Sequence, residues 1–189
     1  SNRTAKLLAL DGAPHGTLVL TAHQSAGRGR LGRVFESPAG KGVYLSVLLR
    51  PAVPAASAQT ATIGAAVAVC RAVQELCGLE LGIKWVNDLY YQGKKVCGIL
   101  TEAGTDLESG RLEWLVVGIG LNLTATAADW PPELAEKAGS LYPGGPAPVS
   151  RAALAGAIAR QLLALCPAFD CLDEYRARCF VPGHWVTVC

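Results

Sequence analysis

One stretch of this sequence limits the possible folds more than any other. Residues 112–122 read LEWLVVGIGLN and are nearly all apolar. A short apolar run with β-branched residues, bounded by polar segments, is typical of a strand that is buried on both faces. We therefore expect residues 112–122 to form a central strand of a β-sheet.

The rest of the chain supplies further strands and helices. Apolar and β-branched runs predict strands at 17–22, 43–50, 81–85, 89–91 and 95–102. The turn Gln92-Gly93-Lys94 joins the last two as a hairpin. The longest helix is predicted at 56–77, and further helices are expected at 4–10, 151–165 and near 169–178. The predicted fold class is α+β, with a mixed, mostly antiparallel central sheet and helices packed on one side.

The composition describes a folded domain. Of the 189 residues, 51% are hydrophobic and 17% are charged, which excludes a disordered chain. The net charge of +2 argues against a general binder of nucleic acid or membrane surfaces. We see no signal peptide and no apolar run that approaches the ~18 residues needed to span a bilayer.

Seven cysteines without a CxxC pair predict free thiols in a cytoplasmic protein. The three histidines lack ligand spacing, so we expect no metal site.

Both ends of the sequence are expected to be cut points. The chain contains no methionine, so Ser1 is not a translation start, and residues 184–189 read as a strand that stops abruptly. We expect one domain over residues 1–180. Residues 181–189 would then be a linker and the first strand of a truncated, small C-terminal β-domain.

The segment 27–33 reads GRGRLGR and follows the predicted strand at 17–22. Glycine lets a backbone bend and approach a ligand closely, and arginine offers a planar donor fork suited to phosphate and carboxylate oxygens. The segment thus predicts a mobile loop that folds over an anionic small molecule. A solvated basic loop and a nucleic-acid patch remain the alternatives at this point.

Two further segments carry polar groups at strand ends. Residues 84–88 read KWVND and are followed by Lys95, so a lysine, an amide and a carboxylate could converge on one pocket. The alternative is a turn held by side-chain hydrogen bonds, with both lysines solvated. Residues 118–122 read GIGLN: glycines inside a buried strand mark close approach of a ligand or another backbone, and Asn122 suits recognition of a base edge. A β-bulge with Asn122 as a plain turn residue is the other interpretation.

Taken together and in this order, these segments resemble the catalytic domain of biotin protein ligases (biotin–acetyl-CoA-carboxylase ligases). The resemblance extends from Ser1 to about Phe180 and rests on Gln24 with GRGRLGR, Ser37-Pro38 with Tyr44-Leu45-Ser46, KWVND, KKVCGILTE (94–102) and GIGLN. It implies the class II synthetase-like fold of biotin and lipoate ligases. It also implies an ATP-dependent ligase that converts biotin to biotinyl-5'-AMP and transfers biotin to a lysine of a biotin carboxyl carrier protein.

The resemblance also implies roles for individual residues. Biotin would be contacted by Ser1, Asn2, Gln24, Arg28, Gly29, Arg30, Lys95, Gly98 and Ile99. The nucleotide would be contacted by Arg28, Arg30, Arg33, Phe35, Asn87 and Asn122. The catalytic groups would be Lys95, Arg30, Lys84 and Asp88, with Asp88 orienting or deprotonating the acceptor lysine. Mg²⁺ would accompany ATP, while neither nucleic acid nor a membrane is expected as a partner. The oligomeric state stays open, a homodimer included.

Two positions depart from the family pattern. The family usually has proline where Val86 stands and tryptophan where Phe35 stands, which bears on the turn and on nucleotide affinity.

Two other functions remain as alternatives. A lipoate-protein ligase shares the fold and the adenylation chemistry, but we expect a loop with fewer arginines there. A non-catalytic sensor of biotin or biotinyl-AMP is the second alternative. A repressor of that type needs a DNA-binding domain upstream of residue 1.

Overall fold

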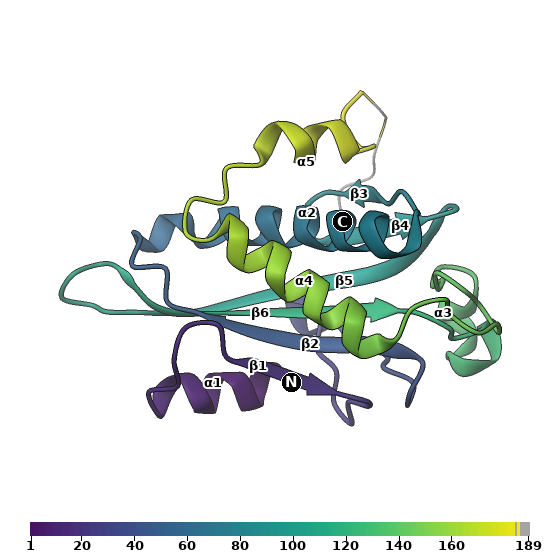
Figure 1. Ribbon diagram of the computed structural model, residues 1–189, viewed down its shortest axis with the longest axis horizontal. Helices are drawn as coiled ribbons and strands as arrows, with labels where there is room; N and C mark the ends of the chain where they lie inside the picture. The colour runs from purple at the N-terminus through teal and green to yellow at the C-terminus, as the bar shows by residue number, and fades with distance from the viewer. Residues whose placement is uncertain (184, 186–189) are drawn as a thin grey trace.

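The computed structural model describes residues 1–183 and 185, so the strand expected at 184–189 lies, apart from residue 185, outside the described residues. The fold is α+β, as predicted (Figure 1). The strands are β1 (Leu18–Thr21), β2 (Gly42–Leu49), β3 (Gly82–Lys84), β4 (Asp88–Tyr91), β5 (Lys94–Thr105) and β6 (Leu112–Asn122). The helices are α1 (Asn2–Leu10), α2 (Ala58–Cys77), α3 (Pro132–Ala135), α4 (Arg151–Leu165) and α5 (Leu172–Arg178).

The six strands form one sheet in the order β1-β2-β6-β5-β4-β3, and each neighbouring pair is antiparallel. Strand β6 lies inside the sheet between β2 and β5, and all of its residues except Glu113 are buried. The expected hairpin joins β4 to β5, where Gln92 and Gly93 take the positive φ angles that such a two-residue turn requires. The central position expected for residues 112–122 is therefore confirmed.

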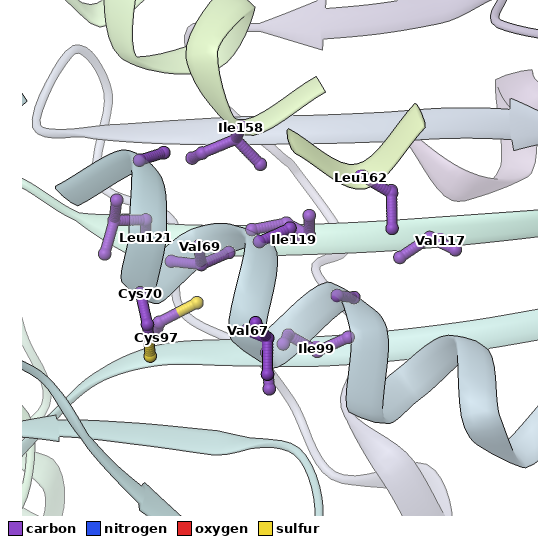
Figure 2. Packing of buried hydrophobic residues seen from close by; sticks show 14 of the residues in the cluster. Val67, Val69, Cys70, Cys97, Ile99, Val117, Ile119, Leu121, Ile158 and Leu162 are labelled. Atoms are coloured by element: carbon purple, nitrogen blue, oxygen red, sulfur yellow. The ribbon is translucent and has the colours of Figure 1, made fainter. Parts of the chain in front are cut away.

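The main core lies between the sheet and the helices α2 and α4. Because successive side chains of a strand point to opposite faces, the odd-numbered residues 115–121 of β6 all face this core. Figure 2 shows Val67 and Val69 of α2 and Ile158 of α4 among the residues of this cluster, together with Val117 and Ile119 of β6. The core therefore uses one face of the sheet.

Helix α1 packs on the opposite face of the sheet, below β2 and β6 in Figure 1. Ala5 and Ala9 of α1 form a second small apolar cluster with Leu48, Trp114 and Val116. The two long helices share one face as expected, and α1 is the exception to the expected one-sided packing. The small alanine side chains bring α1 close to the sheet, which places its first residues beside the even-numbered residues of β6.

The sequence analysis expects no apolar segment long enough to span a bilayer, and helix α2 with the turn that precedes it is an exception. Within the described part of the chain, Ala55–Cys77 is long and apolar enough to cross a membrane by length and composition. In the fold its buried residues instead pack against the sheet, α4 and α5. Its apolar surface is thus that of a core helix.

Candidate functional site

Three glycines form a strip without side chains on the α1 face of the sheet. Gly98 of β5 pairs with Gly120 of β6, and Gly118 lies two residues earlier on β6. A Cβ at Gly118 would overlap the Asn2 amide, and a Cβ at Gly120 would overlap the Phe35 ring. We call Gly98, Gly118 and Gly120 the glycine floor; glycine is required there because other groups approach the backbone directly.

The basic segment forms an irregular hairpin above the glycine floor. Phe35 N donates to Gly27 O over 3.0 Å, and Gly29 N donates to Arg33 O over 2.7 Å. Leu31 and Gly32 take positive φ angles at the tip. A Cβ at Gly27 would collide with the Phe35 carbonyl oxygen, so the hairpin cannot close with a larger residue at that position. We call residues 27–35 the basic hairpin.

Gln24 ties the base of the basic hairpin to the start of α1. Its Oε1 accepts a hydrogen bond from Ser1 Oγ over 3.1 Å, and its Nε2 donates to Ser37 Oγ over 3.0 Å. Ser37 is buried, and its hydroxyl donates in turn to the Phe35 carbonyl oxygen. Polar side chains therefore link the first residue of the chain to the segments just before and just after the basic hairpin.

The Asn2 side chain is turned inward over Gly118. Its Oδ1 accepts from the buried Ser46 Oγ over 2.6 Å, while its Nδ2 donates to Leu100 O and to Glu102 Oε2. Both amide hydrogens are therefore engaged within the protein. In this arrangement Asn2 covers one end of the glycine floor.

Glu102 accepts hydrogen bonds from three side chains. Lys6 Nζ lies 3.1 Å from its Oε1, Asn2 Nδ2 lies 3.0 Å from its Oε2, and Arg28 Nη2 lies 3.4 Å from both oxygens. Burial on its own raises the pKa of the Glu102 carboxyl, but the hydrogen bonds from Asn2 and Lys6 and the charge of Arg28 outweigh it. The net result is a pKa below the usual value, so this carboxylate is charged at neutral pH.

The basic hairpin meets the KWVND segment at its other side. Arg30 Nη1 donates to Asn87 Oδ1 over 3.3 Å, and Asn87 Nδ2 donates to Ile99 O over 2.9 Å. Next to Asn87, Asp88 Oδ1 lies 2.6 Å from Lys95 Nζ. Arg30 and Lys95 therefore both lie at the end of the glycine floor where Asn87 and Asp88 stand. The side chain of Ile99 itself belongs to the core, and its backbone is what Asn87 engages.

Two of the expected cationic groups lie apart from this cluster. Lys84 Nζ lies 5.8 Å from the centre of the Tyr90 ring, and Lys84 forms no ion pair with any described residue. Arg33 is exposed, and within residues 1–183 and 185 its guanidinium makes no hydrogen bond. The structure thus brings together Arg28, Arg30 and Lys95 around the floor but neither Lys84 nor Arg33.

The turn that contains Val86 is held by α5. Tyr175 Oη donates to Val86 O over 3.0 Å, and the Trp85 ring meets the Tyr175 ring edge-on at 6.0 Å between centroids. Tyr175 is itself buried. Packing from α5 therefore fixes this turn where the family pattern has proline.

Asn122 ends β6 in regular register opposite Gly42, so no bulge occurs there. Its Nδ2 donates to Gly139 O over 3.0 Å, whereas its buried Oδ1 has no hydrogen-bond partner among the described residues. Next to Gly139, a cavity of about 220 Å³ is lined by residues that include Trp130 and Ser140, whose buried hydroxyl also lacks a partner within the described chain. Buried polar atoms are rarely left unpaired, so this region can accept a polar ligand.

The described residues hold no group of three or more side chains suited to binding a metal ion. A larger cavity, of about 520 Å³, lies away from the glycine floor between α2, β3 and α5, and its lining includes Glu174 and Arg178. These two residues form an ion pair with each other, and Glu174 also pairs with Arg71. We regard that cluster as a structural network that holds α5 on α2.

Three residues of the site, Glu102, Ser46 and Ser37, belong to motifs quoted from the sequence but were given no role there. The alternation of strands could have found the first two. Glu102 lies on the same face of β5 as Gly98, and Ser46 of β2 is paired with Gly118 of β6. Ser37 belongs to a loop, where no periodicity identifies a buried hydroxyl.

Comparison with known proteins agrees with this geometry. The model of the biotin/lipoate A/B protein ligase family matches residues 1–122. The chain belongs to this family. The matched part of the chain contains the glycine floor, the basic hairpin and the Asp88–Lys95 pair.

Relatives within the family are longer proteins. The bifunctional ligase/repressor BirA of Bacillus subtilis is 43% identical over 141 residues, which are 75% of this chain and 43% of that protein. The biotin–[acetyl-CoA-carboxylase] ligase of Mycobacterium tuberculosis is 32% identical over 182 residues, 92% of this chain and 64% of that protein. The chain thus spans less than half the length of the Bacillus relative and under two thirds of the mycobacterial one.

Solved structures share the fold. The biotin protein ligase from Aquifex aeolicus in complex with biotin and ATP has a TM-score of 0.74 at 27% identity, covering 96% of this chain and 76% of that chain. The Leishmania major biotin protein ligase in complex with biotinyl-5-AMP also has a TM-score of 0.74, at 20% identity, with 98% of this chain and 81% of that chain covered. The second likeness concerns the fold alone.

Proposed function

We propose that this chain is the catalytic domain of a cytoplasmic, ATP-dependent biotin protein ligase. It would form biotinyl-5'-AMP from biotin and ATP, and then transfer biotin to a lysine of a biotin carboxyl carrier protein. The observation that carries the proposal is the meeting of Arg28 and Arg30 from the basic hairpin with Lys95 from β5 around the glycine floor. The complex of the Aquifex relative with biotin and ATP supports the same ligands.

The charges account for the first half-reaction. A biotin carboxylate has to approach the α-phosphate of ATP, and the two anions repel each other. Cationic groups on either side offset that repulsion and stabilise charge on the transferring phosphoryl group. Arg30 and Lys95 would supply these groups, because Asn87 and Asp88 hold them at one end of the floor.

The glycine floor would take the apolar body of biotin where the Phe35 ring now lies, since a backbone surface without side chains lets a ring and an alkyl chain lie flat. Ser1, Gln24 and Arg28 border it with polar groups that match a ureido ring. Gly29 lies in the basic hairpin, whose closure would exclude water from the adenylate. Asn2 would form the end wall of the pocket, since its amide is already engaged.

The nucleotide would lie toward the end of β6. The unpaired Oδ1 of Asn122 could accept a hydrogen bond from an adenine amino group, and the nearby cavity of about 220 Å³ offers space beside it. The Phe35 ring, which lies against the floor at Gly98 and Gly120, would pack beside the ligand where the family has tryptophan. Arg33 and Asn87 would lie near the phosphates. Mg²⁺ would arrive with ATP as part of the substrate, held by phosphate oxygens.

The second half-reaction requires a neutral amine. The acceptor lysine attacks the carbonyl carbon of the acyl-adenylate, the new amide bond forms, and AMP leaves. Asp88 would orient this amine or take its proton. Lys84, two strands' width from the floor in its present contact with Tyr90, would add positive charge to the entrance rather than to the reacting atoms.

The test is incubation of the protein with ATP and labelled biotin, with and without a carrier domain. We expect biotinyl-AMP without the carrier and labelled carrier with it, and no competition by excess lipoate. Preferential labelling with lipoate would instead identify a lipoate ligase. Binding of biotin without any adenylate would identify a sensor, an option that the repressor function in the name of the Bacillus relative makes worth testing.

A further inference from the structure

We propose that Glu102 is a positioning residue of the site. Its carboxylate holds Arg28 beside the glycine floor with most of its donors free for the ligand, and in this way sets the affinity for biotin. The inference rests on the proposed function, because it assigns Arg28 to the bound biotin.

The contact between Glu102 and Arg28 uses one corner of the guanidinium. Nη2 lies 3.4 Å from each carboxylate oxygen, and no other nitrogen of Arg28 donates a side-chain hydrogen bond to a residue of the described chain. A guanidinium carries five N–H donors in a rigid, planar fork. Anchoring one nitrogen therefore fixes the plane of the fork while it leaves donors for a second partner.

The carboxylate is itself held in place. Lys6 and Asn2 lie one helical turn apart on α1 and donate to different oxygens of Glu102. Asn2 is fixed in turn by the buried hydroxyl of Ser46. The Glu102 side chain is only 19% exposed, compared with 54% for Arg28. A carboxylate fixed by two donors beside a more exposed guanidinium is the arrangement in which the first positions the second.

The charge of Glu102 also keeps two cations together. Lys6 Nζ and Arg28 Nη2 both lie within 3.4 Å of Oε1. With a neutral side chain between them, their repulsion would move Arg28 away, because it is the more exposed of the two and belongs to a hairpin. Lys6 is anchored in a helix. The loss of charge at Glu102 should therefore act mainly on Arg28.

The competing explanation is that Glu102 only fastens α1 to β5. A purely structural role predicts a lower melting temperature with effects that add to those of any change at Arg28. A positioning role predicts effects on biotin that disappear once Arg28 is removed, because residues that act through one contact are not additive.

The experiment compares Glu102→Gln, Glu102→Asp, Arg28→Met and the double variant Glu102→Gln/Arg28→Met in the adenylate assay. We expect Glu102→Gln to raise the KM for biotin about tenfold, or about 1.4 kcal/mol, with kcat changed by less than about twofold. Glu102→Asp should recover part of the loss. The double variant should have the same KM as Arg28→Met alone. Glu75→Gln, which removes the α2 carboxylate paired with Arg160 of α4, is the matched control and should leave KM unchanged.

Three results would overturn the inference: an unchanged KM in Glu102→Gln, a double variant whose losses add, or a loss confined to kcat and melting temperature. The wild-type protein separates this inference from the proposed function. If it forms no biotinyl-AMP, the proposed function fails and the inference fails with it. If it does, the variants decide the role of Glu102 alone.

Discussion

Replacing Lys95 by methionine tests the chemical core of the proposal. Methionine keeps the apolar stem of the side chain and removes the ammonium, which lies 2.6 Å from Asp88 Oδ1. An ammonium about 4 Å from a phosphoryl oxygen contributes about 1 kcal/mol in water and about 4 kcal/mol at a partly shielded protein site. The side chain of Lys95 is 34% exposed, which places it between these limits.

A loss of about 2–3 kcal/mol corresponds to a decrease of roughly 30- to 150-fold in the rate of adenylate formation. Lys95→Met also leaves the Asp88 carboxylate without its partner, which adds a negative charge to a site that receives two anions. The double variant Lys95→Met/Asp88→Asn should therefore form the adenylate about tenfold faster than Lys95→Met.

The assay is release of pyrophosphate from ATP in the presence of biotin, without any carrier protein. It reports the first half-reaction alone, so it is insensitive to the role of Asp88 toward the acceptor lysine. Lys137→Ala is the control, because Lys137 is exposed and its carbonyl oxygen accepts from Lys95 N over 2.9 Å. Lys95→Met with near-normal turnover, or a double variant slower than Lys95→Met, would refute the electrostatic reasoning.

Three more predictions concern packing and protonation. In Gly120→Ala the added methyl group would overlap the Phe35 ring, so we expect a loss of about 1–3 kcal/mol in unfolding free energy and weaker biotin binding. Urea titration and calorimetry measure both, and an unchanged variant would contradict the described contact. The hydrogen bond from Arg71 holds the pKa of Glu174 below its usual 4.5, so this group stabilises the fold above that pH and less as the pH falls through its folded pKa. The difference in stability between wild type and Glu174→Gln should thus be present at pH 7 and shrink in acid; a difference that is constant with pH would argue against it. Burial raises the pKa of Cys70 to about 12 and raises that of Cys97 too, so iodoacetamide at pH 8 should modify neither until guanidinium unfolds the protein. Peptide mass spectrometry of the native protein shows whether either thiol reacts.

The sequence was sufficient for the central strand, and it predicts much of the candidate site. The apolar run of β6 predicts its place inside the sheet, and the order of the motifs predicts that Arg30 and Lys95 meet. The strand prediction is confirmed because it depends on a local pattern of burial, and the roles of Arg30 and Lys95 stay a prediction.

The position of α1 could not be predicted in the same way. Leu7 and Leu10 of α1 are exposed, while the helix buries Asn2, Ala5 and Ala9 against the sheet. A reading by hydrophobicity places the leucines inside. The structure favours the alanines because only small side chains allow α1 to approach β2 and β6 closely. The contacts of Asn2 and Glu102 follow from that approach, so they were not visible in the sequence.

The two faces of strand β6 have different roles, which limits the substitutions that this domain can accept. Its odd-numbered residues from Leu115 to Leu121 face the core, and Gly118 and Gly120 between them face the site. A slip of one position in pairing would put aliphatic side chains into the ligand pocket and leave voids in the interior. The same pairing of β6 with its neighbours is therefore needed both for folding and for ligand recognition. In a mutational screen of β6, substitutions at odd-numbered positions should lower thermal stability, and substitutions at Gly118 and Gly120 should lower turnover.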